Sequence, residues 1–264
     1  MSNPFKIGAV PYLNALPLIE GLPENPAVQL RFAPPAQLES ELDAGTLDAA
    51  LLPVASLFDR PRIAMFSFAG IASENAAGSV LFFSQGSKVR KVAYDEGSRT
   101  SVMLLKLLLK EKGHSPEWIP MPSDLGQMLN QADGALLIGD NALISRRDHR
   151  LEFDLVERWR GWTDLPFVFA VWAARADHPR RSEMSKLFTD ASVQGLSRLD
   201  AIAHRKSGHM GLSSWEILTY FKNNMSYRLG KPHLDAIELF RAKCAQMTQM
   251  TTAADRDKDK APVL

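Results

Sequence analysis

Three hydroxyl side chains and a guanidinium stand at the start of a predicted helix. Ser98, Arg99, Thr100 and Ser101 follow an apolar run at residues 91–95 and a glycine turn, and a leucine-rich run comes next. The first N–H groups of a helix have no partner within it, and the helix dipole places partial positive charge there. Hydroxyl and guanidinium groups at such a place bind carboxylates or phosphates. The segment therefore predicts a site for a small anion, and the alternative is a simple helix cap beside a surface arginine.

An asparagine occupies a second loop, between a predicted strand at residues 6–10 and Pro17. Proline suits the first turn of a helix, because its missing N–H would be unpaired there anyway. Asn14 stands where its side chain can cap that helix, and where it can equally point its amide into a ligand cleft. The sequence leaves both alternatives open.

Two further loops carry polar candidates at strand ends. Ser79 begins an apolar run, where it can bind a ligand or satisfy a turn. Ile138, Gly139 and Asp140 end another apolar run, and the aspartate can face a ligand or cap the next helix. These alternatives also stay open.

The sequence lacks the motifs of several large enzyme classes. No glycine-rich phosphate loop follows a strand, no histidine pair has metal-ligand spacing, and no Gly-x-Ser-x-Gly elbow is present. Cys244 is the one cysteine, so an intramolecular disulfide is impossible and structural zinc is not indicated. We therefore expect no metal and no nucleotide or redox cofactor, and no side chain stands out as a general base.

Charge and hydropathy disfavour other classes of protein. The net charge of the 264-residue chain is +1, which provides no large basic field for nucleic acid or an anionic membrane. No run reaches the roughly 18 apolar residues that a membrane span needs, and the first residues do not resemble a secretory signal. We expect a cytoplasmic protein that binds a small molecule and contacts neither nucleic acid nor membrane.

Short apolar runs alternate with helical patterns up to about residue 180, which predicts an α/β fold. Beyond that point the pattern predicts helices only, and the polar residues 251–264 predict a disordered tail. We expect strands at 6–10, 28–33, 47–53, 63–68, 79–84, 91–95, 134–140 and 167–173, and helices at 35–44 and 100–112.

Two chain crossings, near residues 85–88 and 162–167, divide the predicted fold into two lobes. We expect residues 1–86 and 172–250 to form lobe 1 and residues 87–171 to form lobe 2. Ligands of such folds bind at the carboxyl ends of parallel strands, so the loops described above predict a ligand cleft between the lobes.

In their order along the chain, these motifs resemble those of the chorismate dehydratases of the futalosine route to menaquinone. The chain departs from that family at Ala15 and Leu16, where a hydroxyl and a basic residue are usual, and at Asp164, where glycine is usual. The resemblance covers roughly residues 5–175 and is carried by Tyr12-Leu13-Asn14 with Pro17-Leu18, Gly78-Ser79-Val80, Ser98-Arg99-Thr100-Ser101, Leu137-Ile138-Gly139-Asp140, and Trp162-Thr163 with Leu165-Pro166-Phe167-Val168-Phe169-Ala170.

The resemblance implies a two-lobed fold like that of type-2 periplasmic binding proteins. It implies a carbon–oxygen lyase that eliminates water from chorismate to give 3-[(1-carboxyvinyl)oxy]benzoate, without a cofactor, because the product gains an aromatic ring. It also implies that Asn14 and Ser79 are catalytic, and that Arg99 either binds substrate or pairs structurally. The implied substrate-binding residues are Ser98, Arg99, Thr100, Ser101, Ile138, Gly139 and Asp140.

Three other interpretations stay open. The chain could be the enzyme of the same fold that makes 1,4-dihydroxy-6-naphthoate later in the same route, although the Ser-Arg-Thr-Ser pattern disfavours this. It could be a cytoplasmic small-carboxylate binding protein of the same fold without catalysis, although receptors of this fold usually carry a secretory signal. It could be a ligand sensor, although no DNA-binding module is visible.

Overall fold

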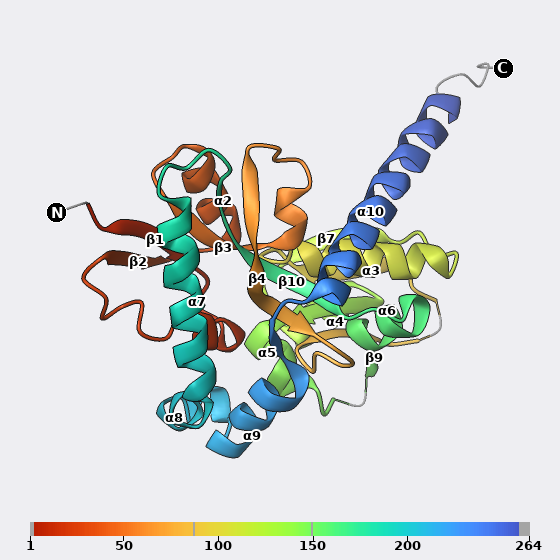
Figure 1. The fold of residues 1–264 in the computed structure, drawn as a ribbon. Coiled ribbons are helices and arrows are strands. Elements are labelled where there is room, and N and C mark those ends of the chain that lie inside the picture. The colour runs from red at the N-terminus through yellow and green to blue at the C-terminus, as the bar shows by residue number, and fades with distance from the viewer. Residues whose placement is uncertain (1–2, 87, 149, 259–264) are drawn as a thin grey trace.

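Two β-sheets organise the chain in the computed structural model, which describes residues 3–86, 88–148 and 150–258 (Figure 1). The first sheet has six strands in the order β11-β4-β10-β3-β1-β2. In this sheet β1 pairs in parallel with β2 and β3, and β10 pairs antiparallel with β3 and β4. Its strands are β1 (Phe5–Ala9), β2 (Val28–Phe32), β3 (Ala49–Pro53), β4 (Ile63–Ser73), β10 (Phe167–Arg175) and β11 (Ser226–Arg228).

The second sheet has five strands in the order β7-β6-β8-β5-β9. Here β6 pairs in parallel with β7 and β8, whereas β5 pairs antiparallel with β8 and β9. Two sheets with helices between successive strands confirm the predicted α/β class. The strands are β5 (Val80–Ser84), β6 (Lys91–Asp95), β7 (Glu117–Met121), β8 (Gly134–Ile138) and β9 (Leu151–Asp154).

Helices connect the strands and extend the first lobe towards the C-terminus. The α-helices are α1 (Leu16–Ile19), α2 (Pro35–Asp43), α3 (Thr100–Glu111), α4 (Leu125–Gln131), α5 (Gly139–Ser145), α6 (Leu155–Thr163), α7 (Arg181–Ser197), α8 (Leu199–Arg205), α9 (Ser214–Thr219) and α10 (Lys231–Lys258). The short 3-10 helices are η1 (Leu13–Ala15), η2 (Val54–Leu57) and η3 (His209–Gly211), and η4 (Tyr220–Asn224) is a π-helix.

The C-terminal region differs from the sequence prediction in two respects. The three-residue strand β11 lies among helices, where we expected helices only, because it adds to the edge of the first sheet beside β4. Helix α10 continues to Lys258 and projects beyond both sheets (Figure 1), whereas we expected a disordered tail from residue 251. Residues 259–264 of that predicted tail lie outside the described residues.

The chain makes its first crossing between the sheets earlier than predicted, whereas the return falls within the crossing predicted near residues 162–167. Strand β5 belongs to the second sheet, so the first crossing lies at residues 74–79 and not at residues 85–88. Strand β10 belongs wholly to the first sheet, so the return lies at residues 164–166, and the expected boundary after residue 171 falls inside this strand. We therefore propose that the lobes divide at these two connections.

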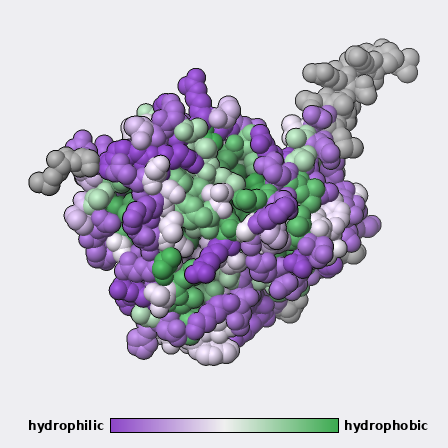
Figure 2. Space-filling model, viewed as in Figure 1, coloured by the Kyte–Doolittle hydropathy of each residue, from purple (hydrophilic) through white to green (hydrophobic). Residues whose placement is uncertain are grey.

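A continuous core of buried side chains runs from the first sheet into the second. At the return crossing, Trp159 is fully buried and its indole N–H donates to the carbonyl oxygen of Pro166 at 3.0 Å. The Phe167 ring packs edge-on against Phe240 of α10, with centroids 5.0 Å apart. Apolar residues also gather in the middle of one face, over β4 and β10, with polar residues around them (Figure 2). This packing fixes the crossing that leads into β10.

Asp164 ends α6 in the left-handed conformation, with φ of 56°. That conformation costs a residue with a Cβ atom about 1 kcal/mol, and the exposed ion pair of Asp164 with Arg160 contributes little. We expect Asp164→Gly to raise the free energy of unfolding in urea by about 0.5 kcal/mol, after the greater flexibility of unfolded glycine is subtracted. Asp164→Ala keeps the backbone strain and loses the ion pair. An equal rise in its free energy of unfolding would contradict the explanation that relief of this strain stabilises Asp164→Gly.

Candidate active site

A small cavity lies between the two sheets, and both lobes contribute to its wall. Its volume is about 80 Å³, which leaves room for several water molecules. The wall contains all of the residues predicted from the sequence except Ser79 and Asp140. The lining residues are Val10, Tyr12, Asn14, Pro35, Leu51, Pro53, Ile71, Val80, Gly97, Ser98, Arg99, Thr100, Ser101, Ile138, Gly139, Phe169 and Ala170.

Asn14 lies in η1 and caps neither η1 nor α1. Of the two alternatives for this residue, the structure excludes the helix cap. Its Oδ1 atom is buried and has no hydrogen-bond partner among the described residues. A buried acceptor without a donor costs about 1–3 kcal/mol. Such an atom at the wall of a cavity is an arrangement that a ligand donor, or a water, would satisfy.

Ser79 is buried next to the lining residue Val80, and its partner is a residue that the sequence analysis missed. The Ser79 hydroxyl is 2.8 Å from the hydroxyl of Tyr220, and both side chains are buried. Burial raises the pKa of Tyr220 well above its usual value, and the neighbouring Ser79 and Asn14 side chains partly oppose this rise. Tyr220 is therefore a neutral phenol at physiological pH, placed between the two residues expected to be catalytic.

The three hydroxyl groups at the start of α3 differ in whether they already have hydrogen-bond partners within the protein. Ser98 Oγ accepts the N–H of Val102 at 3.2 Å, so it already serves the first turn of the helix. Thr100 Oγ1 accepts the N–H of Ala55 at 3.2 Å and donates to the carbonyl of Phe169 at 3.1 Å. No hydrogen bond of Ser101 Oγ is found within the described residues. Of the three hydroxyls, that of Ser101 is thus the one left for an anion, together with the N–H groups that precede Val102 at the start of α3.

Arg99 reaches across the cleft to the other lobe. Its side chain is half exposed, and its Nε lies 3.8 Å from Oε1 of Glu39 on α2. Glu39 is buried, with Ser56 Oγ at 2.5 Å and Arg60 Nη2 at 3.0 Å. Arg99 therefore makes an ion pair between the lobes and also lines the cavity, so substrate binding by Arg99 stays a prediction beside its structural pairing.

Gly139 and Asp140 shape the loop of Asn14. Gly139 has φ of +59°, and a Cβ atom at this position would lie 3.4 Å from the ring of Tyr12. Its N–H donates to the carbonyl of Ser79 at 2.8 Å. Asp140 Oδ1 accepts the N–H of Leu13 at 3.1 Å, so this carboxylate holds η1 across the cleft and lies outside the cavity lining.

We expect Thr100→Val to weaken the junction of the lobes. Valine keeps the shape but leaves the N–H of Ala55 and the carbonyl of Phe169 without the threonine hydroxyl, and Phe169 lies at a register shift of β10. Unpaired buried groups predict a loss of about 2–3 kcal/mol of unfolding free energy in urea. Thr100→Ser keeps the hydroxyl and is the control, so similar losses in both variants would contradict this role.

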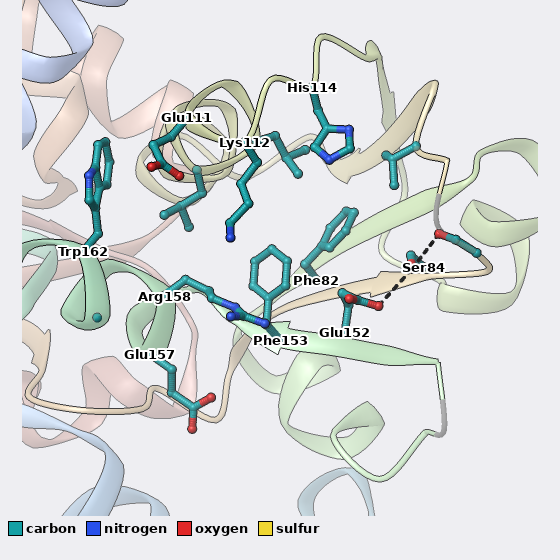
Figure 3. A pocket seen from close by; sticks show the side chains of 15 residues that line it. Phe82, Ser84, Glu111, Lys112, His114, Glu152, Phe153, Glu157, Arg158 and Trp162 are labelled. Carbon is teal, nitrogen blue, oxygen red and sulfur yellow. Dashed lines mark hydrogen bonds between the residues drawn. The ribbon is translucent and has the colours of Figure 1, made fainter.

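A larger groove lies between the C-terminal part of α3 and helix α6, over β5 and β9 (Figure 3). Its volume is about 830 Å³, and Trp162 of the family motifs lines it, but none of the predicted catalytic or substrate-binding residues does. Carboxylates stand among its basic groups, so it has no clear preference for an anion. Its charged and titratable side chains are Glu111, Lys112, His114, Glu152, Glu157 and Arg158.

The described part of the chain holds no group of three or more histidine, cysteine, aspartate or glutamate side chains that could bind a metal ion. Among the helices of the same residues, none is long and apolar enough to cross a membrane.

Comparison with solved structures identifies the fold. A crystallised protein from Archaeoglobus fulgidus matches with a TM-score of 0.76 at 16% identity, covering 94% of this chain and 99% of that one. The periplasmic aliphatic sulphonate binding protein of Escherichia coli matches with a TM-score of 0.64 at 13% identity, covering 96% of this chain and 89% of that one. These matches confirm the predicted two-lobed fold like that of periplasmic binding proteins.

Comparison of sequences identifies the family. Residues 5–246 match the family described as menaquinone biosynthesis. The chorismate dehydratase of Thermus thermophilus is 30% identical over 260 residues, which cover 90% of this chain and 94% of that protein. The resemblance found in the motifs is thereby confirmed, and the chain belongs to the menaquinone biosynthesis family as a relative of chorismate dehydratase.

Proposed function

We propose that this protein is a chorismate dehydratase, a hydro-lyase that converts chorismate into 3-[(1-carboxyvinyl)oxy]benzoate and water. The observation that carries the proposal is the identity with the Thermus thermophilus chorismate dehydratase along nearly the whole of both chains. The cavity adds support, because the residues expected from the family motifs meet there from both lobes.

The proposed reaction needs only a proton acceptor and a stabilised leaving group. The bond between the ring carbon and its hydroxyl breaks, the neighbouring ring hydrogen leaves as a proton, and the ring becomes aromatic. The substrate's own enolpyruvyl carboxylate accepts that proton, and its transfer to the departing hydroxide gives the water and restores the carboxylate. This assignment explains why no side chain of the cavity wall stands out as a general base.

Each part of the wall has a proposed role. Ser101 and the first N–H groups of α3 bind one substrate carboxylate, where the helix dipole favours negative charge. Asn14 holds the enolpyruvyl group in the geometry for proton transfer. Apolar side chains on the opposite wall, including Leu51, Ile71 and Phe169, pack on the ring. Holding the carboxylate beside the ring hydrogen accelerates the proton transfer, because the reacting groups are already oriented.

We place the protein in the cytoplasm as part of this proposal, because a menaquinone biosynthesis enzyme finds a soluble substrate there. The alternative is a small-carboxylate binding protein of the same fold without catalysis. The fold alone does not exclude it, since the sulphonate binding protein of Escherichia coli shares it.

One experiment separates these functions. The purified protein is mixed with chorismate in the presence of a chelator, and loss of chorismate is followed together with formation of the meta-substituted benzoate. Stoichiometric product without added cofactor is the expected result. Tight binding of chorismate without product would favour the binding protein, and neither binding nor product would contradict both functions.

A further inference from the structure

The π-helix η4 is hydrogen-bonded at both of its ends to the loop that carries Ser79. At its first residue, Tyr220 places its hydroxyl 2.8 Å from Ser79 Oγ. At its last residue, Asn224 donates from Nδ2 to the carbonyl of Ala76 at 2.9 Å. A Cβ atom at Gly78 would lie 3.2 Å from the same Nδ2 atom, so the loop passes close to the helix. π-Helical turns are rare and are often found at functional sites.

The Tyr220 hydroxyl has one clear acceptor. It faces side chains from two separate segments, Ser79 at the start of β5 and Asn14 in η1. Asn14 Oδ1 has no hydrogen-bond partner, so the phenolic proton is not held by that atom. A phenol is more acidic than an aliphatic alcohol, and in a pair of hydroxyl groups only one donates to the other. The distance fits either direction, and the greater acidity of the phenol favours Tyr220 as the donor and Ser79 Oγ as the acceptor.

The direction of this bond matters for Ser79. A serine hydroxyl has one hydrogen and two lone pairs. When a lone pair accepts from Tyr220, the serine hydrogen must point elsewhere, and it is free to donate to a ligand. Without the phenol, the serine hydrogen can turn back into the buried space that the phenol oxygen occupied.

We propose that Tyr220 is a positioning residue, which directs the Ser79 hydrogen towards the hydroxyl group that leaves the substrate. This inference rests on the proposed dehydration, because only an elimination creates a leaving oxygen that gains negative charge. The Ser79 hydroxyl stabilises that charge as the carbon–oxygen bond breaks. Tyr220 does not touch the substrate and changes no bond of it.

Tyr227 provides a matched control. It is also buried, and its hydroxyl has no hydrogen-bond partner among the described residues. Replacing either tyrosine with phenylalanine removes one buried oxygen from the same region of the chain. Only Tyr220→Phe removes a contact with Ser79.

The test measures kcat and KM for chorismate in the wild type, Tyr220→Phe, Tyr227→Phe, Ser79→Ala and the Ser79→Ala/Tyr220→Phe double variant. We expect Tyr220→Phe to lower kcat about ten- to hundredfold with little change in KM, which marks an interaction strengthened in the transition state. We expect Tyr227→Phe to match the wild type. In the Ser79→Ala background, Tyr220→Phe should not lower kcat any further, because the serine hydroxyl that Tyr220 directs is absent.

The outcomes separate this inference from the proposed function. A wild type that makes no product would contradict the dehydratase itself, and the role of Tyr220 with it. An active wild type with an unaffected Tyr220→Phe variant, or with equal losses in both backgrounds, would overturn the role of Tyr220 alone. If Tyr220→Phe does not fold, the comparison of the double variant with Ser79→Ala still tests the role of Tyr220. The double variant removes both hydroxyl groups of the pair and leaves neither one unpaired. A double variant much slower than Ser79→Ala would then refute the inference.

Discussion

Replacing Asn14 with alanine is expected to lower kcat for chorismate by about two to three orders of magnitude, the typical loss when one oriented polar group is removed from an active site. The amide lines the cavity, its Oδ1 atom is buried without a partner, and it caps no helix. Its removal relieves an unpaired acceptor and takes away the side-chain hydrogen bond with Tyr220. These two effects oppose each other, so we expect the variant to unfold at about the same urea concentration as the wild type.

This combination of effects distinguishes a catalytic role from a structural one. Asn130→Ala in α4 is the control, because it makes the same truncation at an exposed helical position that does not line the cavity. We expect the control to keep full turnover. An Asn14→Ala variant with wild-type turnover would contradict the role given to the amide, and one that loses stability together with activity would assign Asn14 to the fold.

The start of α3 illustrates what local sequence can predict. A glycine turn, polar residues and a leucine-rich run predicted a helix that begins at a ligand site, and α3 begins at Thr100 beside the cavity. Which hydroxyls are free was not predictable, because it depends on distant groups. The Thr100 hydroxyl is hydrogen-bonded to backbone groups of Ala55 and Phe169, which are 45 and 69 residues away along the chain.

Tyr220 shows a second limit of sequence reasoning. It is 141 residues from Ser79, and it lies in a π-helix that has no local signature in the sequence. The first crossing between the lobes was placed too late for a related reason. The apolar strands β4 and β5 are joined by a short connection, and this pattern fits a hairpin as well as a crossing between sheets.

Gly195→Ala is expected to damage both stability and activity, because it lies where α7 crosses α1. A Cβ atom at residue 195 would lie 1.8 Å from the carbonyl oxygen of Pro17, a distance that only a movement of the backbone can relieve. Added volume in a packed contact of this kind costs about 1–3 kcal/mol, occasionally more. Helix α1 directly follows η1, which carries Asn14, so its displacement also moves the amide from the cavity wall.

Gly161→Ala in α6 makes the same change at a helical glycine where a Cβ atom meets nothing within 4 Å. Alanine is the better helix former by about 0.5–1 kcal/mol, so this control is expected to gain stability in the urea titration. The two variants should therefore shift the unfolding midpoint in opposite directions, and only Gly195→Ala should lower kcat. A gain of stability in both would mean that α1 and α7 have room to separate freely. The close approach of Gly195 to Pro17 would then not be what holds the Asn14 loop against the cavity.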